Sequence, residues 1–391
     1  MLLLNEICNA FSVIIDLAGE RNNEHSKRTA YIATRLSRLM GASEEMCFFG
    51  GLLHDLGASG ELSIYGLKEI HTQGELMYDH AAIGAKILSY FPCLKGLSEI
   101  VKYHHEYYDG SGAFKLKAEL IPLESRILNF ADHLDLFING QVPTTNLRFK
   151  IFDWVLNRSG KKIFPEIKDA FFEIAKTEEF WLDLEVRNLD YSLKKVEPGP
   201  IYISFNDFEA IAKAFSTVID NKSRFTHEHS LNLQKISSKV AINLGYDEQK
   251  VRKISIAAYL HDLGKVMVPS SILEKPAKLT PEEFAIIRQH SYYTKKILRQ
   301  INGLEEIAEW AGNHHERLNG KGYPEGLTNL SEEEQIIAIS DVYVALVENR
   351  PYRKGMSHQE AMAILKNMVQ RGELDYKLLK KFNSIITEKI A

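Results

Sequence analysis

One pattern of polar residues occurs twice in this chain of 391 residues. The segment Leu-Leu-His-Asp-Leu-Gly at 52–57 returns at 259–264 with one change, and the His-His-Glu triplet at 104–106 returns at 314–316. Equivalent histidines and aspartates are separated by 204 to 210 residues throughout. Such regular spacing indicates duplication of one domain, so every motif has to be interpreted together with its counterpart.

The rest of the chain follows a helical pattern. Apolar residues recur three or four positions apart, as at Leu233 and Ile236, which predicts helices. Residues 194–206 contain two prolines and a glycine, a composition typical of a linker. A chain this long usually forms more than one domain. We therefore predict an all-α protein of tandem helical bundles, divided into residues 1–193 and 207–391.

The composition argues against several classes of protein. Lysine and arginine number 48 against 52 aspartates and glutamates, a net charge of -4, which does not suit a partner that is a polymeric nucleic acid. The three cysteines, Cys8, Cys47 and Cys93, are widely spaced, which favours reduced thiols and a cytoplasmic location. No run of 18 uncharged apolar residues occurs, so we predict no membrane span.

Histidines concentrate at the repeated positions, which hold ten of the fourteen in the chain. A single His-Asp pair is weak evidence for a metal, but imidazole and carboxylate together are typical ligands of divalent metals. The second half has five histidines and two aspartates in the pattern, more than one ion needs. The predicted ligands of two divalent ions are His229, His261, Asp262, His290, His314, His315 and Asp341.

Asp262 follows His261 directly and is placed to bridge two ions. His229 and Asp341 would complete the first ion, and the other three histidines of the set would complete the second. Two ions about 3.5 to 4 Å apart lower the pKa of a shared water and generate hydroxide near neutral pH. The predicted chemistry is therefore hydrolysis, with Asp262 as a catalytic residue.

The second half resembles the HD-GYP family over residues 207–391. The resemblance rests on His229, His261-Asp262, Gly264-Lys265, His290, His314-His315-Glu316, Gly322-Tyr323-Pro324, Asp341 and Arg350-Pro351-Tyr352-Arg353. It implies a helical HD domain with two metal ions, iron or manganese, that hydrolyses a cyclic dinucleotide. The usual substrate is cyclic di-GMP, and in some members it is a cyclic GMP-AMP. The product is a linear dinucleotide, with onward cleavage to mononucleotides left open.

Several further residues become candidates beside the ligands. The ammonium of Lys265 can stabilise charge on a phosphate in the transition state, or it can simply favour the end of a helix. Gly322, Tyr323 and Pro324 form a rigid turn that suits either a wall for the substrate or a surface for a signalling protein. Arg350 and Arg353 have the chemistry to clamp a second phosphate, although solvated surface charges are an equal alternative.

The chain departs from the family pattern at two places. Asn319-Gly320 stands where the family usually has Asp-Gly. Phe225 stands where members with a third metal have a glutamate, so we expect two metals. We expect His227 to face solvent, with a role as an extra ligand the less favoured alternative.

The first half keeps an apparently complete ligand set but lacks the other motifs. Ala58 replaces the lysine, Ala113-Phe114 replaces Tyr-Pro, and the Arg-Pro-Tyr-Arg run has no counterpart. We expect a divergent HD domain with a regulatory or structural role, which binds metal or a regulatory nucleotide, or is a remnant whose histidines only pack. The possible second metal set is His25, His54, Asp55, His80, His104, His105 and Asp132.

These observations predict a metal-dependent phosphodiesterase that acts on a cyclic dinucleotide. Two alternatives remain open. One is an HD phosphohydrolase of another nucleotide, such as a deoxynucleoside triphosphate or a guanosine tetraphosphate. The other is a nucleotide-sensing or adaptor module with weak or no turnover.

Overall fold

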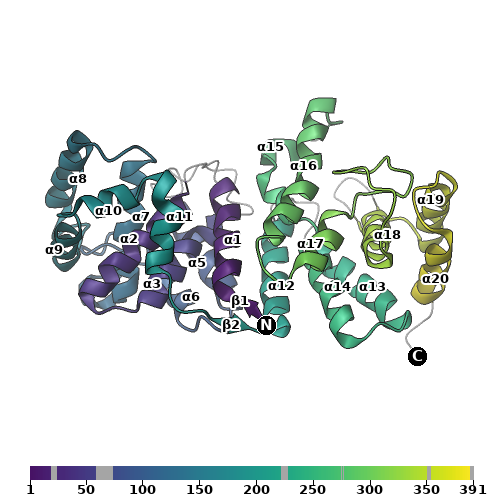
Figure 1. The fold of residues 1–391 in the computed structure, drawn as a ribbon, viewed down its shortest axis with the longest axis horizontal. Helices are drawn as coiled ribbons and strands as arrows, with labels where there is room; N and C mark the ends of the chain where they lie inside the picture. The colour runs from purple at the N-terminus through teal and green to yellow at the C-terminus, as the bar shows by residue number, and fades with distance from the viewer. Residues whose placement is uncertain are drawn as a thin grey trace. The chain divides into compact units, whose positions relative to one another are not determined.

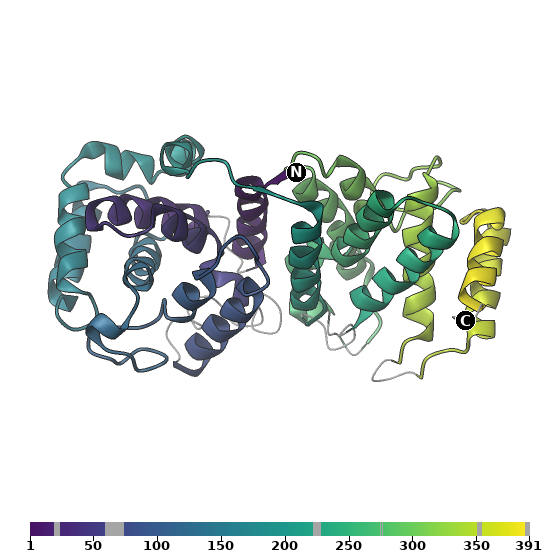
Figure 2. The ribbon, with the colours of Figure 1, turned by 90° about the horizontal axis from the view of Figure 1, so that it is seen from below.

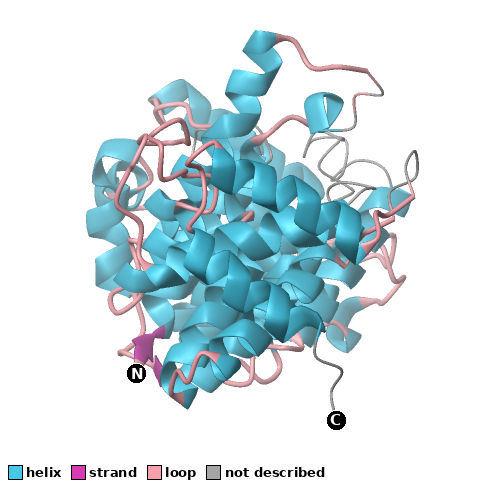
Figure 3. Cartoon of the chain, turned by 90° about the vertical axis from the view of Figure 1, so that its right-hand side faces the viewer, coloured by secondary structure: helices cyan, strands magenta, loops and turns pink. Residues whose placement is uncertain are grey.

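The computed structural model describes residues 1–18, 24–58, 74–221, 228–273, 275, 277–349 and 354–387. The chain divides into two compact units, one formed by Leu3–Ile201 and the other by Met1–Leu2 with Tyr202–Ala391. Both are helical, as Figures 1 and 3 show, and the sheet of the described residues has only the short strands β1 (Leu2–Leu3) and β2 (Tyr202–Ile203). The prediction of an all-α fold is confirmed.

The first unit begins with the elements that carry its histidines and continues with four further helices. Its elements are α1 (Leu4–Ala18), α2 (His25–Met40), α3 (Glu44–Leu53), η1 (His54–Ala58), α5 (Gly74–Leu88), α6 (Leu97–Lys102), η3 (Ala118–Leu120), α7 (Leu123–Ile138), α8 (Thr145–Arg158), α9 (Pro165–Ile174), α10 (Glu178–Asp183) and α11 (Val186–Val196).

The second unit repeats the first part of this order. Its elements are α12 (Phe205–Asn221), α13 (His229–Asn243), α14 (Glu248–Leu260), η4 (Leu263–Met267), α15 (Ser270–Leu273), α16 (Pro281–Leu298), α17 (Glu305–Gly312), α18 (Glu332–Val347), α19 (His358–Gln370) and α20 (Tyr376–Thr387). Helices α12, α13, α14, α16, α17 and α18 correspond in order to α1, α2, α3, α5, α6 and α7.

The predicted linker at 194–206 is only partly irregular. It contains the last turn of α11, the strand β2 and the first residues of α12. The β-branched and aromatic run at Ile201, Tyr202 and Ile203 explains the strand, because such residues favour extended backbone. The division between the units lies between Ile201 and Tyr202.

The two units differ in the helices that come after the repeated ones. In the first, α9 and α11 pack on α2, and Tyr31 of α2 stacks on Phe180 and donates a hydrogen bond to Asp183 (2.8 Å). In the second, α19 and α20 lie side by side, yellow in Figures 1 and 2. Each unit thus uses its own C-terminal helices to cover the helices that carry histidines.

The core of the second unit holds α18, the helix that carries Asp341, in place. Val240 of α13, Ile339 of α18, Leu365 of α19 and Phe382 of α20 belong to one buried cluster. Burying an aliphatic or aromatic side chain of this size contributes about 1.5 to 3 kcal/mol. The cluster therefore positions α18, whose opposite face carries Asp341 toward the histidines. Within the described residues, no helix has the length and apolar character needed to cross a bilayer.

Candidate metal centres

Each helix that begins with the first histidine is anchored by an aspartate nine residues before that histidine. In the second unit, Asp220 accepts hydrogen bonds from the backbone N–H of Ser230 (3.0 Å) and from its hydroxyl (2.9 Å). In the first, Asp16 accepts the same two bonds from Ser26 at 3.1 and 2.6 Å. These carboxylates satisfy N–H groups at the start of α13 and α2 and so position the first histidine of each unit.

A glycine in the turn after each His-Asp pair allows a very close approach of two segments. A Cβ atom at Gly264 would lie 2.1 Å from the carbonyl oxygen of His290, and one at Gly57 would lie 1.9 Å from that of His80. Both contacts are far inside van der Waals distance. These positions therefore require glycine, and the tight packing brings the His-Asp pair against the histidine of the next helix.

In the second unit the predicted ligands converge. The ligand atoms of His290, His314 and His315 lie within 4.8 Å of one another, and so do those of His229, His261 and Asp262. The seventh residue, Asp341, joins the second group because its Oδ1 lies 3.1 Å from His229 Nε2. The site thus draws on α13, α16, α18, the end of α14 and the residues after α17.

Asp262 lies between the two histidine groups. Its Oδ2 is 3.0 Å from Nε2 of His261, whereas its Oδ1 is 3.4 Å from Nε2 of His290 and 4.0 Å from Nε2 of His314. One carboxylate therefore presents a different oxygen to each group. This is the arrangement that a bridging ligand requires.

The histidines are oriented with one particular nitrogen toward the centre. Nδ1 of His261, His290 and His314 donates to the carbonyls of Ala258, Ile287 and Ala311 at 2.9, 2.6 and 2.7 Å. A carbonyl only accepts, so Nδ1 carries the proton and Nε2 presents its lone pair to the site. This is the tautomer that binds a metal through Nε2.

The spacing of these lone pairs fits a shared cation. Nε2 of His290 and Nε2 of His314 face each other at 3.3 Å, although neither carries a proton in this tautomer. Two imidazole nitrogens bound to one ion at about 2.1 Å lie about 3.0 to 3.4 Å apart in octahedral to tetrahedral geometry. The donor set therefore fits divalent metal ions, and its chemistry specifies neither their number nor their identity.

Electrostatics keeps most of the ligands in the form that binds metal. Burial, reinforced by His261 and His290, lowers the pKa of His314 to about 3. Burial raises the pKa of Asp262, but the charges of His261 and Lys265 outweigh it and hold that pKa well below its usual range. A neutral imidazole and an ionised carboxylate bind a cation without first losing a proton.

Lys265 forms an ion pair with Asp262. Its ammonium lies 2.5 Å from Oδ2 of that carboxylate, three residues away in the chain. The motifs predicted a lysine aimed at a phosphate, whereas the ammonium contacts a predicted metal ligand directly. The side chain of Lys265 nevertheless remains partly exposed. The first unit has the small, buried Ala58 at this position.

The glutamate of each His-His-Glu triplet holds the loop after it. Oε1 of Glu316 accepts from the N–H of Glu325 (2.6 Å), and Oε2 accepts from that of Leu327 (2.9 Å). A Cβ atom at Gly322 would lie 2.4 Å from the Cα of Glu316, so the loop folds back closely over this residue. In the sequence, Glu316 was recognised only as part of a motif, and its role in holding the loop was missed.

This loop places Tyr323 beside the histidines. Its backbone N–H donates to the carbonyl of His315 (3.2 Å), and the two rings lie 4.7 Å apart. The guanidinium of Arg288 lies over the same ring, 4.7 Å from its centroid. Pro324 follows directly in the turn. Arg288 was missed because residues two apart on a helix point to different sides, so its spacing from His290 gives no signal in the sequence.

The structure gives a local reason for Asn319. Its Oδ1 accepts from the N–H of Lys321 (3.1 Å), as an aspartate does, but its Nδ2 also donates to the carbonyl of Arg371 (3.0 Å). An aspartate has no such donor. The side chain of Asn319, which departs from the family pattern, therefore connects the loop to the segment between α19 and α20.

We expect Asn319→Asp to lower stability by about 1 kcal/mol or less, because one exposed hydrogen bond is lost. Hydrolysis should be unchanged, since the Lys321 contact is retained. Thermal unfolding and steady-state kinetics of the purified variant measure both effects. A large loss of turnover with unchanged stability would show instead that this position takes part in the reaction.

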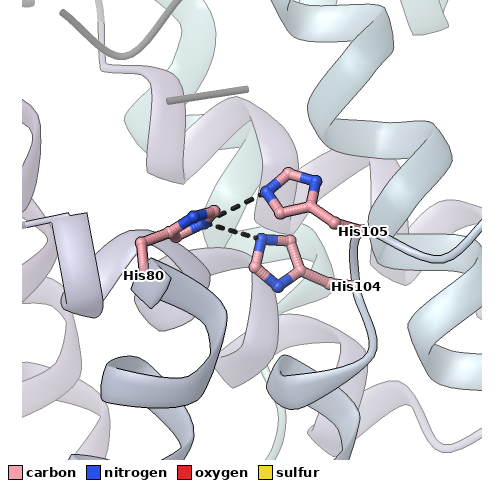
Figure 4. Close-up of side chains that lie close together, drawn as sticks. All are labelled: His80, His104 and His105. Carbon is pink, nitrogen blue, oxygen red and sulfur yellow. Dashed lines mark hydrogen bonds between the residues drawn. The ribbon is translucent and has the colours of Figure 1, made fainter. Parts of the chain in front are cut away.

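The first unit brings its own seven residues together in the same way. Nε2 of His80 lies 3.3 Å from Nε2 of His104 and 3.0 Å from Nε2 of His105, and dashed lines in Figure 4 mark both contacts. Asp55 lies between this group and the other two histidines, with Oδ1 3.5 Å from His80 Nε2 and Oδ2 3.4 Å from His54 Nε2. His25 and Asp132 lie together as His229 and Asp341 do in the second unit, with Nε2 of His25 3.4 Å from Oδ1 of Asp132.

Each first histidine is also held by a carboxylate that the repeat does not reveal. In the first unit, Nδ1 of His25 donates to Asp135 (2.7 Å), which is paired with the buried Arg28. In the second, Nδ1 of His229 donates to Glu348 (3.1 Å). Asp135 lies within α7, whereas Glu348 follows the last residue of α18, so aligning the halves does not match the two carboxylates.

Six residues named from the sequence lie outside the described residues. They are Arg350 and Arg353, the candidates for a second phosphate, with Pro351 and Tyr352 between them, and Phe225 and His227.

Known proteins share the HD pattern over both halves. A family model described as an HD domain matches residues 213–378, and another matches residues 23–136. The 3'3'-cGAMP-specific phosphodiesterase 1 of Vibrio cholerae serotype O1 is 31% identical over 92% of this chain and 86% of its own length. The cyclic di-GMP phosphodiesterase of Thermotoga maritima is 32% identical over 60% of this chain and 61% of its own length.

A solved structure shares the fold over the whole chain. The crystal structure of a cyclic GMP-AMP specific phosphodiesterase of V. cholerae matches with a TM-score of 0.69, covering 99% of this chain and 98% of that one at 22% identity. The fold, the two HD-domain matches and the relative of nearly full length agree with the resemblance expected from the motifs. The chain belongs to the HD-GYP family of the HD superfamily, with a divergent N-terminal HD repeat.

Proposed function

We propose that the second unit is a metal-dependent phosphodiesterase that hydrolyses a cyclic dinucleotide, either cyclic di-GMP or 3'3'-cyclic GMP-AMP. The observation that carries this proposal is the position of Asp262 between two groups of Nε2 atoms. The activities named for the relatives support the class of substrate. Opening one phosphodiester bond with water gives a linear dinucleotide.

The proposed centre holds two divalent ions, with iron or manganese expected. The ligands of one ion would include His229, His261 and Asp341, and those of the other would be the remaining three histidines, with Asp262 shared. When bound, two such ions supply an activated water and neutralise negative charge on the phosphate. The protein contributes ligands held in the correct tautomer and a site in which few groups have to reorganise.

The remaining groups of the site act on the substrate. We assign Lys265 to the phosphate under attack, because its ammonium is already held at the ligand that faces both histidine groups. Gly322, Tyr323 and Pro324 would form a wall beside His315 against which a base can pack. Arg350 and Arg353 stay as candidates for the second phosphate, and a signalling protein at the Gly322–Pro324 turn stays a prediction.

The work is divided between the repeats in this proposal. Residues 207–391 carry out catalysis, and residues 1–193 serve a regulatory or structural purpose. The difference rests on Lys265 and Tyr323, whose counterparts Ala58 and Ala113 can neither donate to a phosphate nor stack on a base.

Arg288 is expected to bind substrate rather than to take part in bond cleavage. It is exposed and stacks on Tyr323 at the edge of the site, so Arg288→Ala should raise KM about tenfold through loss of a charge-assisted contact, with kcat and metal content unchanged. The matched control is Arg299→Ala, an exposed arginine at the end of the same helix that pairs with Glu309. Equal KM values for the two variants would contradict this role.

The proposed function is tested with protein purified without oxygen and analysed for bound metals. Cyclic di-GMP, 3'3'-cyclic GMP-AMP, a deoxynucleoside triphosphate and guanosine tetraphosphate are each incubated with it, and the products are separated. We expect a linear dinucleotide from a cyclic substrate only, and none from the variant with both His261→Ala and Asp262→Ala. Tight binding without turnover in metal-loaded protein would favour the sensing module, and turnover of the linear nucleotides alone would favour the other phosphohydrolase.

A further inference from the structure

We propose that Thr294 is a positioning residue of the second unit. Its buried hydroxyl is inserted into the turn at His261-Asp262 and sets the direction in which Asp262 points. The proposal rests on the metal centre of the proposed function. Thr294 belongs to none of the motifs that the two halves share, because Gly84 stands at the equivalent position of the first unit.

Thr294 lies on the face of α16 that packs on the His-Asp turn. It comes four residues after His290, and residues four apart share one face of a helix. This face contacts η4, and it approaches Gly264 so closely that a Cβ atom there would clash with the backbone of His290. The side chain of Thr294 is fully buried. Its hydroxyl therefore faces the backbone of the turn and not solvent.

The hydroxyl of Thr294 bonds both ends of this turn. Its Oγ1 accepts from the N–H of Gly264 (2.9 Å) and donates to the carbonyl of His261 (3.1 Å). An N–H and a carbonyl three residues apart are the pair that a β-turn or a 3-10 helix joins directly. The hydroxyl of Thr294 thus stands between two groups that otherwise bond each other.

The first unit shows the same turn without a hydroxyl. Its 3-10 helix η1 begins at His54, and the pattern of such a helix joins the N–H of Gly57 directly to the carbonyl of His54. A Cβ atom at Gly84 would lie 3.3 Å from the nitrogen of Gly57 and 3.6 Å from the oxygen of His54. The position of Gly84 therefore faces the same two backbone groups but offers them no side chain.

The backbone at the shared carboxylate differs between the units in the way that an inserted hydroxyl explains. Both residues of the first His-Asp pair belong to η1, whereas η4 begins only at Leu263, after the second pair. Asp262 has φ -99° and ψ 11°, in a sparsely populated region where many active-site residues lie. This conformation directs a carboxylate that faces both groups of histidines. Thr294 therefore acts on the metal centre through the backbone of Asp262.

Three substitutions separate the hydrogen bonds of Thr294 from its packing. Thr294→Val keeps the shape of the side chain but leaves the buried N–H of Gly264 and the carbonyl of His261 without their partner. Thr294→Ser keeps the hydroxyl and loses only a methyl group. Thr294→Gly gives the second unit the residue of the first and allows the turn to close directly.

Cobalt(II) binding to the full-length, chelator-treated protein measures the effect on the centre. Visible absorbance is recorded during the titration, and the signal of the variant with both His261→Ala and Asp262→Ala is subtracted, so that only the second unit is followed. We expect Thr294→Val and Thr294→Gly to need about 10- to 100-fold more cobalt(II), the range typical of groups that support metal ligands. Thr294→Ser should stay within about threefold of wild type, because it keeps both hydrogen bonds.

The matched control is Thr34→Val in the first unit. Thr34 is also fully buried, and its hydroxyl donates to the carbonyl of Ala30 in its own helix (2.7 Å). This variant should bind cobalt(II) as wild type does. Circular dichroism is recorded for each protein, and Thr294→Gly takes the place of Thr294→Val if the latter does not fold. Wild-type affinity in the folded variant without the hydroxyl, or an equal loss in Thr294→Ser, would overturn the role of the hydroxyl.

Hydrogen exchange of the metal-free protein distinguishes this role from the proposed function. The segment 261–264 should exchange its amide protons faster in Thr294→Val than in wild type or Thr294→Ser, because the N–H of Gly264 has lost its acceptor. Mass spectrometry of the digested protein measures the rates. A wild-type protein without a cobalt(II) signal that depends on His261 and Asp262 would refute the metal centre itself. Equal exchange in all three proteins would instead overturn the insertion of the hydroxyl into the turn.

Discussion

Replacing Asp262 by alanine is expected to abolish hydrolysis and to release both ions from the second unit. The carboxylate presents one oxygen to His261 and the other to His290, so no neighbouring side chain can take over its position. The effect should exceed the roughly 10- to 100-fold loss caused by removal of a group that merely supports a ligand. Elemental analysis and product formation on the same anaerobic preparation measure both consequences.

The matched control is Asp55→Ala, which removes the equivalent carboxylate of the first unit. It should lower metal content and the melting temperature while turnover per folded molecule is retained. Circular dichroism of both variants is needed, because removing a buried ligand can unfold a domain and imitate a catalytic loss. Metal content and rate equal to wild type in folded Asp262→Ala protein would refute the site.

Much of the site could be predicted because the duplication repeats its spacing. Each His-Asp pair ends a helix and each His-His pair comes after one, so a constant separation of the pairs in sequence indicated a constant arrangement in space. The all-α fold was predicted for a similar reason, since apolar residues recur at helical spacing in both halves.

The supporting residues were harder to predict. Asp135 lies three residues after Asp132, whereas Glu348 lies seven residues after Asp341, so the carboxylates that hold His25 and His229 do not align. Side chains that reach a common point from different helical turns leave no shared pattern in the sequence. Asp16 and Asp220 do align with the repeat, and a search that extended it before the first histidine would have found them.

The residues around the ligands give the two centres different chemistry. Both units use the same seven ligand types and orient their imidazoles through backbone carbonyls. Around the first centre, Tyr107 and His133 cover Asp132. Around the second, a partly exposed His315 and a lysine face the open side. In the proposed division of work, the partly exposed His315 and the ammonium of Lys265, rather than the ligand set, distinguish the catalytic unit.

Lys265→Ala should separate metal binding from chemistry. An ammonium group is not a metal ligand, so both ions should remain, whereas a preorganised donor to the phosphate is lost. Loss of one such donor costs about 2.7 to 4 kcal/mol in the transition state, which lowers kcat about 100- to 1,000-fold with a smaller change in KM. Because Lys265 also contacts Asp262 at 2.5 Å, metal content has to be measured on the same preparation.

A second variant separates the effect of the hydrogen-bond geometry of Lys265 from the effect of its positive charge. Lys265→Arg keeps the positive charge but changes the donor geometry, so it should recover only part of the lost kcat while binding metal normally. Lys275→Ala is the control, since Lys275 is a lysine paired with Glu283 in the same unit. It should leave kcat unchanged. A decrease below about threefold in Lys265→Ala, with full metal content, would mean that this ammonium only neutralises Asp262 and that the phosphate is stabilised by the ions and other cations of the site.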